Sequence, residues 1–135
     1  MRKRHNSTFI NDSIATLPDA SVAAINAFSD NLGAIILGGQ DEGYDFTGLA
    51  ERLSKLKDVI IYALPGGTRI KEMLDQKGVK YQSIETVEDC VKSAYQNLVE
   101  GRVCLLSPAS PSFDQFENYQ ERGRLFKEWV EKYGK

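Results

Sequence analysis

The chain has 135 residues, of which 41% are hydrophobic and 27% are charged, as in an ordinary soluble domain. Its 17 Lys and Arg residues against 19 Asp and Glu residues give a formal net charge of −2. Nucleic acids and anionic membranes attract clustered excess positive charge, which this composition lacks. The apolar runs at residues 34–37 and 59–64 are far shorter than the roughly 20 residues of a membrane-spanning helix. We therefore expect a cytoplasmic protein that binds neither nucleic acid nor membrane.

Strands and helices are predicted to alternate along the whole chain. Runs that are apolar on both faces are typical of strands buried in a parallel sheet, and apolar residues at helical spacing lie between them. In chain order we expect a strand at 8–11, a helix at 21–28, a strand at 34–37, a helix at 46–56, a strand at 59–64, a helix at 68–75, a strand at 80–84, a helix at 87–99, a strand at 103–106 and a helix from 113 to about 132. Such alternation requires right-handed crossovers. The predicted fold is α/β and Rossmann-like: an open, mostly parallel sheet with helices on both faces, forming one domain over residues 1–135.

Several residues predict where helices end and what their faces contact. Asp19 or Ser21 is expected to cap the first helix behind Pro18, and Gly78 to end the third. An aromatic and aliphatic stripe on the last helix is expected to be core: Phe116, Leu125, Phe126, Trp129, Val130 and Tyr133. Cys90 and Cys104 lack the spacing of a disulfide framework or a metal site, so both are expected to be reduced.

Small and polar residues follow several of the predicted strands. They form the segments 11–13, 38–41, 65–68 and 107–112. Ligands of open parallel sheets bind beyond the carboxyl ends of the strands, so these segments are expected to meet at one candidate site. Ser112 is expected to cap the last helix, whose free N–H groups at Phe113 would accept a carboxylate or phosphate. The alternative is that the glycines and prolines only form tight turns.

The motifs of autonomous catalysis are missing from the sequence. It contains neither GxxxxGK[ST] nor GxGxxG, so it has no phosphate-cradling loop, and it has no GxSxG elbow. Its single histidine is His5, far from any predicted strand end. Asp12, Asp41 and Asp45 are scattered over two loops and do not predict a metal site. The residues alone predict a ligand-contacting domain without catalytic or metal-binding residues.

The motifs at 11–16, at 37–39 with Asp45-Phe46, and at 106–116 with Arg122-Gly123 resemble the C-terminal domain of bacterial Mur ligases. The last stretch resembles the glutamate-adding, MurD-type branch of that family. The resemblance covers essentially the whole chain. It implies that the N-terminal UDP-binding domain and the central ATPase domain of such a ligase are absent from this chain.

The resemblance implies an ATP-dependent, amide-forming ligase of peptidoglycan synthesis. ATP would phosphorylate the terminal carboxylate of UDP-N-acetylmuramoyl-L-alanine, and the glutamate amine would attack the resulting acyl phosphate. ATP and Mg²⁺ would be bound mainly by the missing central domain, and UDP-N-acetylmuramoyl-L-alanine through the missing domains. This chain would position glutamate and close over ATP, and would be monomeric and inactive alone.

The resemblance also implies roles for particular residues. Asp12 matches an aspartate near the ATP ribose, and Thr16 a threonine that touches glutamate. Ser112 and the backbone of Phe113 match a clamp for a glutamate carboxylate, at which the backbone of Tyr119 also lies. A dicarboxylate requires such hydroxyl and N–H donors.

Two positions depart from the family pattern. Ile14 stands where the best-known members have a lysine, and Glu42 where a lysine or arginine meets the glutamate side chain. A carboxylate at that place would repel the substrate. Arg69, after the third strand, is the candidate for the missing positive charge. Whether the substrate is D- or L-glutamate stays open.

Two other functions remain possible on the sequence alone. The chain could be a stand-alone Rossmann-like module that binds a nucleotide or small anion, or a purely structural interaction domain. A GKT/S phosphate-binding motif encoded upstream of the chain would favour the ligase.

Overall fold

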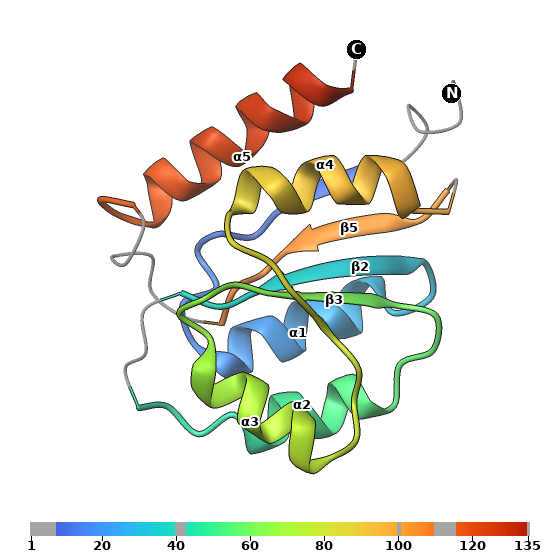
Figure 1. The fold of residues 1–135 in the computed structure, drawn as a ribbon, viewed down its shortest axis with the longest axis vertical. Coiled ribbons are helices and arrows are strands. Elements are labelled where there is room, and N and C mark those ends of the chain that lie inside the picture. The colour runs from blue at the N-terminus through green and yellow to red at the C-terminus, as the bar shows by residue number, and fades with distance from the viewer. Residues whose placement is uncertain (1–7, 40–42, 100, 110–115, 135) are drawn as a thin grey trace.

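The computed structural model describes residues 8–39, 43–99, 101–109 and 116–134. Strands and helices alternate in it as predicted: β1 (Thr8–Asn11), α1 (Pro18–Phe28), β2 (Leu32–Leu37), α2 (Thr47–Ser54), β3 (Ile60–Ala63), α3 (Thr68–Gln76), β4 (Gln82–Ser83), α4 (Val87–Asn97), β5 (Val103–Leu106) and α5 (Tyr119–Tyr133). The strands form one sheet in the order β1-β5-β2-β3-β4, and every neighbouring pair is parallel (Figure 1). The predicted open parallel sheet is confirmed.

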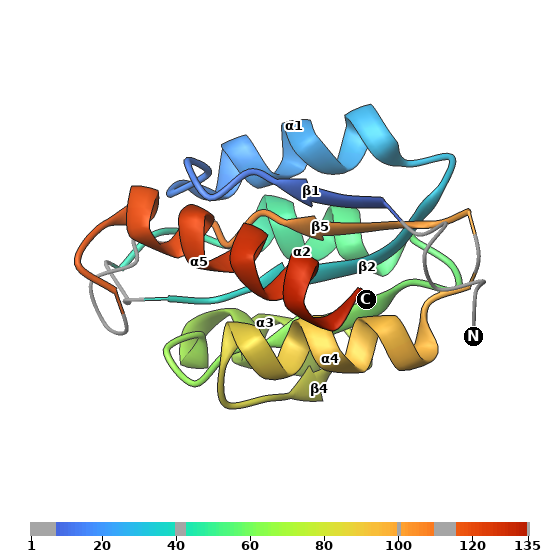
Figure 2. The ribbon, with the colours of Figure 1, turned by 90° about the horizontal axis from the view of Figure 1, so that it is seen from above.

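The helices cover both faces of the sheet. Figure 1 shows α1, α2 and α3 beneath the sheet and α4 and α5 above it, and Figure 2 looks down on α4 and α5. Along β2, Ile35 and Leu37 pack against the first group of helices, while Ala34 and Ile36 pack against the second. Side chains alternate between the two faces of a strand, so β2 must be apolar at every position to be covered on both sides.

The predicted start of the first helix is wrong. The first helix begins at Pro18 after the N-cap residue Leu17, so neither Asp19 nor Ser21 caps it. Proline fits the first helical position because its missing N–H has no partner there anyway. The third helix ends as predicted just before Gly78: its last residue is Gln76 and its C-cap is Lys77, and Gly78 follows with a φ of 69°, a left-handed conformation that glycine adopts without strain.

The last helix begins at Tyr119 rather than at Phe113. Its N-cap is Asn118, whose side chain accepts a hydrogen bond from the backbone N–H of Glu121 at 2.8 Å. The Glu121 carboxylate in turn accepts from the backbone N–H of Glu117 at 3.0 Å. This capping pair starts the helix later than the apolar pattern indicated. Ser112 therefore does not cap the last helix, and it lies outside the described residues.

Five of the six residues predicted to form a core stripe lie in or against one core cluster, although Phe116 precedes α5 rather than lying on it. Phe126 is buried, and Phe116, Trp129, Val130 and Tyr133 are half-buried against the same cluster as α4 and the upper face of the sheet. Leu125 is also half-buried.

Both cysteines are buried free thiols. Burial raises the pKa of Cys104 to about 12, and it raises the pKa of Cys90 as well. Only the thiolate is nucleophilic, so neither side chain is reactive at neutral pH.

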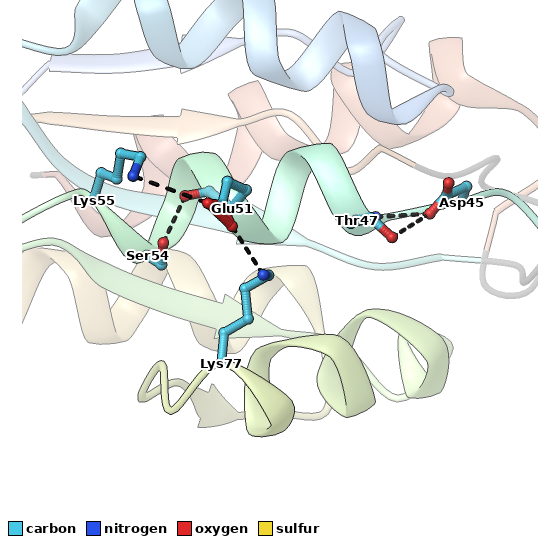
Figure 3. A network of polar contacts seen from close by, with 6 residues as sticks. All are labelled: Asp45, Thr47, Glu51, Ser54, Lys55 and Lys77. Carbon is cyan, nitrogen blue, oxygen red and sulfur yellow. Dashed lines mark hydrogen bonds and ion pairs between the residues drawn. The ribbon is translucent and has the colours of Figure 1, made fainter.

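Exposed carboxylates stabilise the helices on the lower face (Figure 3). Asp45, just before α2, accepts hydrogen bonds from the hydroxyl of Thr47 at 2.6 Å and from its backbone N–H at 2.9 Å. Glu51 on α2 pairs with Lys77 after α3, with 2.8 Å between Nζ and Oε1. The Thr47 hydrogen bonds lower the pKa of Asp45, and the hydrogen bond and charge of Lys77 lower that of Glu51.

We expect Asp45→Ala to destabilise the domain only where Asp45 is ionised. A pKa that is lower in the folded than in the unfolded state adds stability above the unfolded value, and this is lost as the pH falls through the folded value. The melting temperature of Asp45→Ala should thus be below that of the wild type at pH 7 and equal to it near pH 2. Asp30→Ala, in an exposed turn, is the matched control. An equal deficit for Asp45→Ala at both pH values would contradict the prediction.

Candidate functional site

The carboxyl ends of β1, β5, β2 and β3 meet at one edge of the sheet, to which the β5 arrow points in Figure 1. We call the described residues of this edge, 11–16, 37–39, 64–68 and 106–109, the carboxyl rim. Backbone N–H groups join its segments: Asp12 donates to Leu106 at 2.8 Å, Gly38 to Pro108 at 2.9 Å, and Leu64 to Leu37 at 2.9 Å. The predicted convergence of the strand-end loops is confirmed for these residues.

Some rim glycines serve the close packing of the turns. Gly38 has a φ of 111°, and a Cβ there would lie 3.1 Å from the backbone nitrogen of Leu64. A Cβ on Gly67 would lie 3.2 Å from the carbonyl oxygen of Leu64. The packing of the turns therefore accounts for glycine at these two positions.

Asp12 belongs to a polar network that crosses from β1 to β5. The Ser107 hydroxyl lies 2.9 Å from Oδ2 of Asp12 and 3.1 Å from the hydroxyl of Ser21. The Ser21 hydroxyl donates to the carbonyl of Ser107 at 2.7 Å. Both serines are buried, whereas Asp12 is half-exposed. The network therefore holds the Asp12 carboxylate from its buried side.

A buried arginine connects the same loop to α5. Arg122 is 1% exposed, and its Nε and Nη2 donate to the hydroxyl and carbonyl of Ser13, each at 2.8 Å. The Ser13 hydroxyl donates to the carbonyl of Tyr119 at 2.8 Å. A Cβ on Gly123 would lie 2.7 Å from the amide nitrogen of the Asn11 side chain, which would have to move to make room for it. The Arg122-Gly123 pair thus holds the loop after β1 against the start of α5.

Thr16 lies at the outer end of that loop. The preceding Ala15 is buried, and its carbonyl accepts from the backbone N–H of Ala109 at 2.9 Å. Ala109 is a buried non-glycine residue with a φ of 66°. Within the described residues the Thr16 hydroxyl makes no hydrogen bond, and the side chain is half-exposed. It is therefore available to a ligand at the rim.

Ile14 and Tyr119 line a cavity of about 440 Å³ between this loop and α5. Ile14 is 64% exposed and Tyr119 is 37% exposed. The backbone carbonyl of Tyr119 is already bonded to Ser13. Tyr119 thus lies beside the loop after β1, and its side chain is not core, whereas its expected place at the Ser112 and Phe113 clamp falls on residues outside the described ranges.

Arg69 lies on the opposite side of the rim. It is exposed in the first turn of α3, directly after the β3 end. The strands β5 and β2 separate β3 from β1, and at about 4.8 Å per strand this places the two ends roughly 14 Å apart. The structure therefore brings Asp12, Thr16 and Tyr119 together and leaves Arg69 at a distance. Ser112, Phe113 and Glu42 lie outside the described residues.

The residues that hold the site were not predicted as site residues. Ser107 and Arg122 were only parts of motifs, and Ser21 was interpreted as a helix cap. Their partners lie 86 to 109 residues away in the sequence, so no local pattern indicates the contacts. A serine inside an otherwise apolar strand end, and an arginine on the core side of a helix, were the available signals.

The described ranges contain neither a group of side chains suited to a metal ion nor a helix suited to a membrane. Within the described ranges no group of three or more His, Cys, Asp or Glu residues could hold a metal ion. In the same ranges no helix combines the length and apolarity needed to cross a membrane.

An open parallel sheet with polar loops gathered at its carboxyl rim is the arrangement in which α/β domains bind ligands. A family model described as "Mur ligase, glutamate ligase domain" matches residues 1–110. The chain belongs to the Mur ligase family.

Similar curated proteins carry the name UDP-N-acetylmuramoylalanine–D-glutamate ligase. The chain is 43% identical to the one from Koribacter versatilis over 92% of this chain and 27% of that protein. It is 42% identical to the one from Hahella chejuensis, over 90% of this chain and 28% of that protein. It is also 42% identical to the one from Aquifex aeolicus, over 90% of this chain and 29% of that protein. The chain thus spans less than a third of the length of these relatives.

Proposed function

We propose that the chain is the C-terminal domain of an ATP-dependent ligase that joins glutamate to UDP-N-acetylmuramoyl-L-alanine in peptidoglycan synthesis. The observation that carries this is the 43% identity with a named D-glutamate ligase over 92% of the chain. The UDP-binding and ATPase domains would lie in the part of the ligase outside this chain. We propose that the ligase is cytoplasmic and monomeric and uses D-glutamate.

In this function the rim binds and orients the incoming amino acid. The free Thr16 hydroxyl donates a hydrogen bond to one glutamate carboxylate, and Ser112 with the N–H of Phe113 binds the other. Holding the amine against the activated carboxylate lowers the barrier, because an oriented nucleophile is worth roughly 7 to 11 kcal/mol. The residues of this chain act by positioning and transfer no proton.

The rim fits part of a nucleotide but not its metal. ATP supplies the phosphoryl group that activates the acceptor carboxylate. Asp12 presents a half-exposed carboxylate that can accept hydrogen bonds from the ribose hydroxyls. No metal cluster occurs in the described ranges, and the sequence has no phosphate-cradling motif. Mg²⁺ and the phosphates would therefore be held by the remainder of the ligase.

The test is amide formation by the full-length ligase that carries this chain. Purified enzyme is given UDP-N-acetylmuramoyl-L-alanine, ATP, Mg²⁺ and either D- or L-glutamate, and ADP release and the peptide product are measured. We expect product with D-glutamate, and no ATP hydrolysis by the 135-residue chain alone. Absence of product with both enantiomers would overturn the proposal.

We expect Thr16→Val and Ser112→Ala each to raise the KM for glutamate about tenfold, because each removes a hydroxyl donor to a carboxylate. The KM for ATP should change little. Thr8→Val, at the exposed amino end of β1 and so at the opposite end of the sheet, is the control for a lost threonine hydroxyl. If the glutamate KM of either site variant stays within twofold of the wild type, that residue does not bind glutamate.

A stand-alone nucleotide- or anion-binding module is not favoured. The chain matches a Mur ligase domain model over most of its length, and its named relatives are ligases more than three times as long.

A further inference from the structure

We infer that Ser107, supported by Ser21, is a positioning residue that aims the Asp12 carboxylate at the ribose hydroxyls of the bound nucleotide. The inference rests on the proposed function and deepens it. It assigns to two buried serines the discrimination between ribonucleotides and deoxyribonucleotides.

The hydroxyl protons of Ser21 and Ser107 point to different acceptors. Each hydroxyl has one proton to donate. The Ser21 proton goes to the Ser107 carbonyl, at 2.7 Å, so the Ser21 oxygen can only accept from Ser107. The Ser107 hydroxyl then faces two acceptors, Oδ2 of Asp12 at 2.9 Å and the Ser21 oxygen at 3.1 Å. The carboxylate is the nearer and the charged acceptor, so the Ser107 proton points to Asp12.

Both the main chain and the side chain of Asp12 are held by hydrogen bonds. Its backbone N–H donates to Leu106 at 2.8 Å, and its carbonyl accepts from Ala15 at 2.9 Å. With the main chain fixed at both groups, the side chain keeps its rotation about the Cα–Cβ and Cβ–Cγ bonds. The hydrogen bond from Ser107 to Oδ2 removes that freedom. Ser107 is itself fully buried, and its carbonyl accepts a hydrogen bond from the Ser21 hydroxyl at 2.7 Å.

The second carboxylate oxygen of Asp12, Oδ1, can accept hydrogen bonds from a ligand. Within the described part of the chain, Oδ1 of Asp12 receives no hydrogen bond. Asp12 is half-exposed, and a carboxylate with a fixed direction at the rim where ligands bind in parallel sheets is an acceptor for hydroxyl donors. Neighbouring ribose hydroxyls are such donors. A carboxylate free to rotate would bind them less well, because binding would have to fix its orientation.

The test compares Ser107→Ala and Ser21→Ala with Ser93→Ala in the full-length ligase. Ser93 bonds the hydroxyl of Tyr62 at 2.8 Å on the far side of the sheet, so its variant controls for the loss of a partly buried serine hydroxyl. For each protein we would measure the melting temperature, the KM values for ATP and glutamate, and kcat/KM with ATP, 2′-deoxy-ATP and 3′-deoxy-ATP.

We expect Ser107→Ala to raise the KM for ATP roughly tenfold, the lower end of the effect of a hydrogen bond to a charged group. Its preference for ATP over at least one deoxy analogue should fall by a similar factor, with the glutamate KM unchanged. Ser21→Ala, which keeps the bond from Ser107 to Asp12, should show a smaller change of the same kind. Ser93→Ala should lower the melting temperature without changing the preference for ATP over 2′-deoxy-ATP or over 3′-deoxy-ATP.

The inference is wrong if Ser107→Ala, like Ser93→Ala, lowers only the melting temperature and keeps the full preference for ATP. It is also wrong if the KM values for ATP and glutamate rise together, since that indicates a general loosening of the rim. Failure of the proposed function gives a different result, because the wild-type ligase then forms no glutamate amide at all.

Discussion

Replacing Arg122 by alanine should lower the free energy of unfolding by about 3–6 kcal/mol, because it removes two hydrogen bonds from a charged group that contribute roughly 1.5–3 kcal/mol each. Arg122 is 1% exposed and makes two hydrogen bonds of 2.8 Å to Ser13. Its removal leaves the Ser13 carbonyl without this donor and opens space between the β1 loop and α5. Urea denaturation of the 135-residue chain, followed by far-ultraviolet circular dichroism, measures the change.

Arg124→Ala is the matched control for this experiment. Arg124 lies on the same helix, but it is exposed and pairs with Glu128 four residues on, at 2.8 Å. Such pairs contribute only about 0.3–0.5 kcal/mol. Arg122→Lys should lower the free energy of unfolding by an amount between those of Arg122→Ala and Arg124→Ala, because one ammonium group cannot reproduce the two donors of the guanidinium plane. A loss below about 1 kcal/mol for Arg122→Ala would show that the buried arginine does not hold the site together.

In the full-length ligase, Arg69→Ala should raise the KM for glutamate tenfold or more, whereas Glu42→Lys should leave it nearly unchanged. A hydrogen bond between charged groups contributes roughly 1.5–3 kcal/mol, which corresponds to a 10- to 150-fold change. The expectation assumes that Arg69, at the β3 end of the rim, supplies the positive charge for the glutamate side chain. Glu42 would then face water, because an uncompensated carboxylate would repel a dicarboxylate substrate.

Steady-state kinetics on three variants decide this point. Lys71→Ala removes a like charge two residues along α3 and should change the glutamate KM by less than twofold. The competing arrangement has Glu42 beside the substrate, in which case Glu42→Lys should lower the KM severalfold. That gain, together with an unchanged KM for Arg69→Ala, would show that Arg69 is the wrong residue. The roughly 14 Å between the β1 and β3 ends makes Arg69 the most demanding of the proposed contacts.

The sequence predicted most of the fold because the decisive signals are local. Runs such as 34–37 and 103–106 are apolar on both faces, which only a strand covered by helices on two sides requires. Once the strands are parallel, their carboxyl ends must share an edge, so the convergence of the polar loops followed from topology. The start of the last helix was misplaced because an apolar stripe does not reveal a capping residue, and here Asn118 determines the first turn.

The sequence by itself determined the elements, the parallel sheet, the rim and, through its motifs, the resemblance to Mur ligases. Only the tertiary structure decided how the rim is held: Ser107 and Ser21 against Asp12, and Arg122 against Ser13. These partners are separated by about 90 to 110 residues, and their pairing depends on β5 lying next to β1 in the sheet. The serine hydroxyls and the guanidinium group can be buried there because each has a hydrogen-bonding partner from a distant part of the sequence.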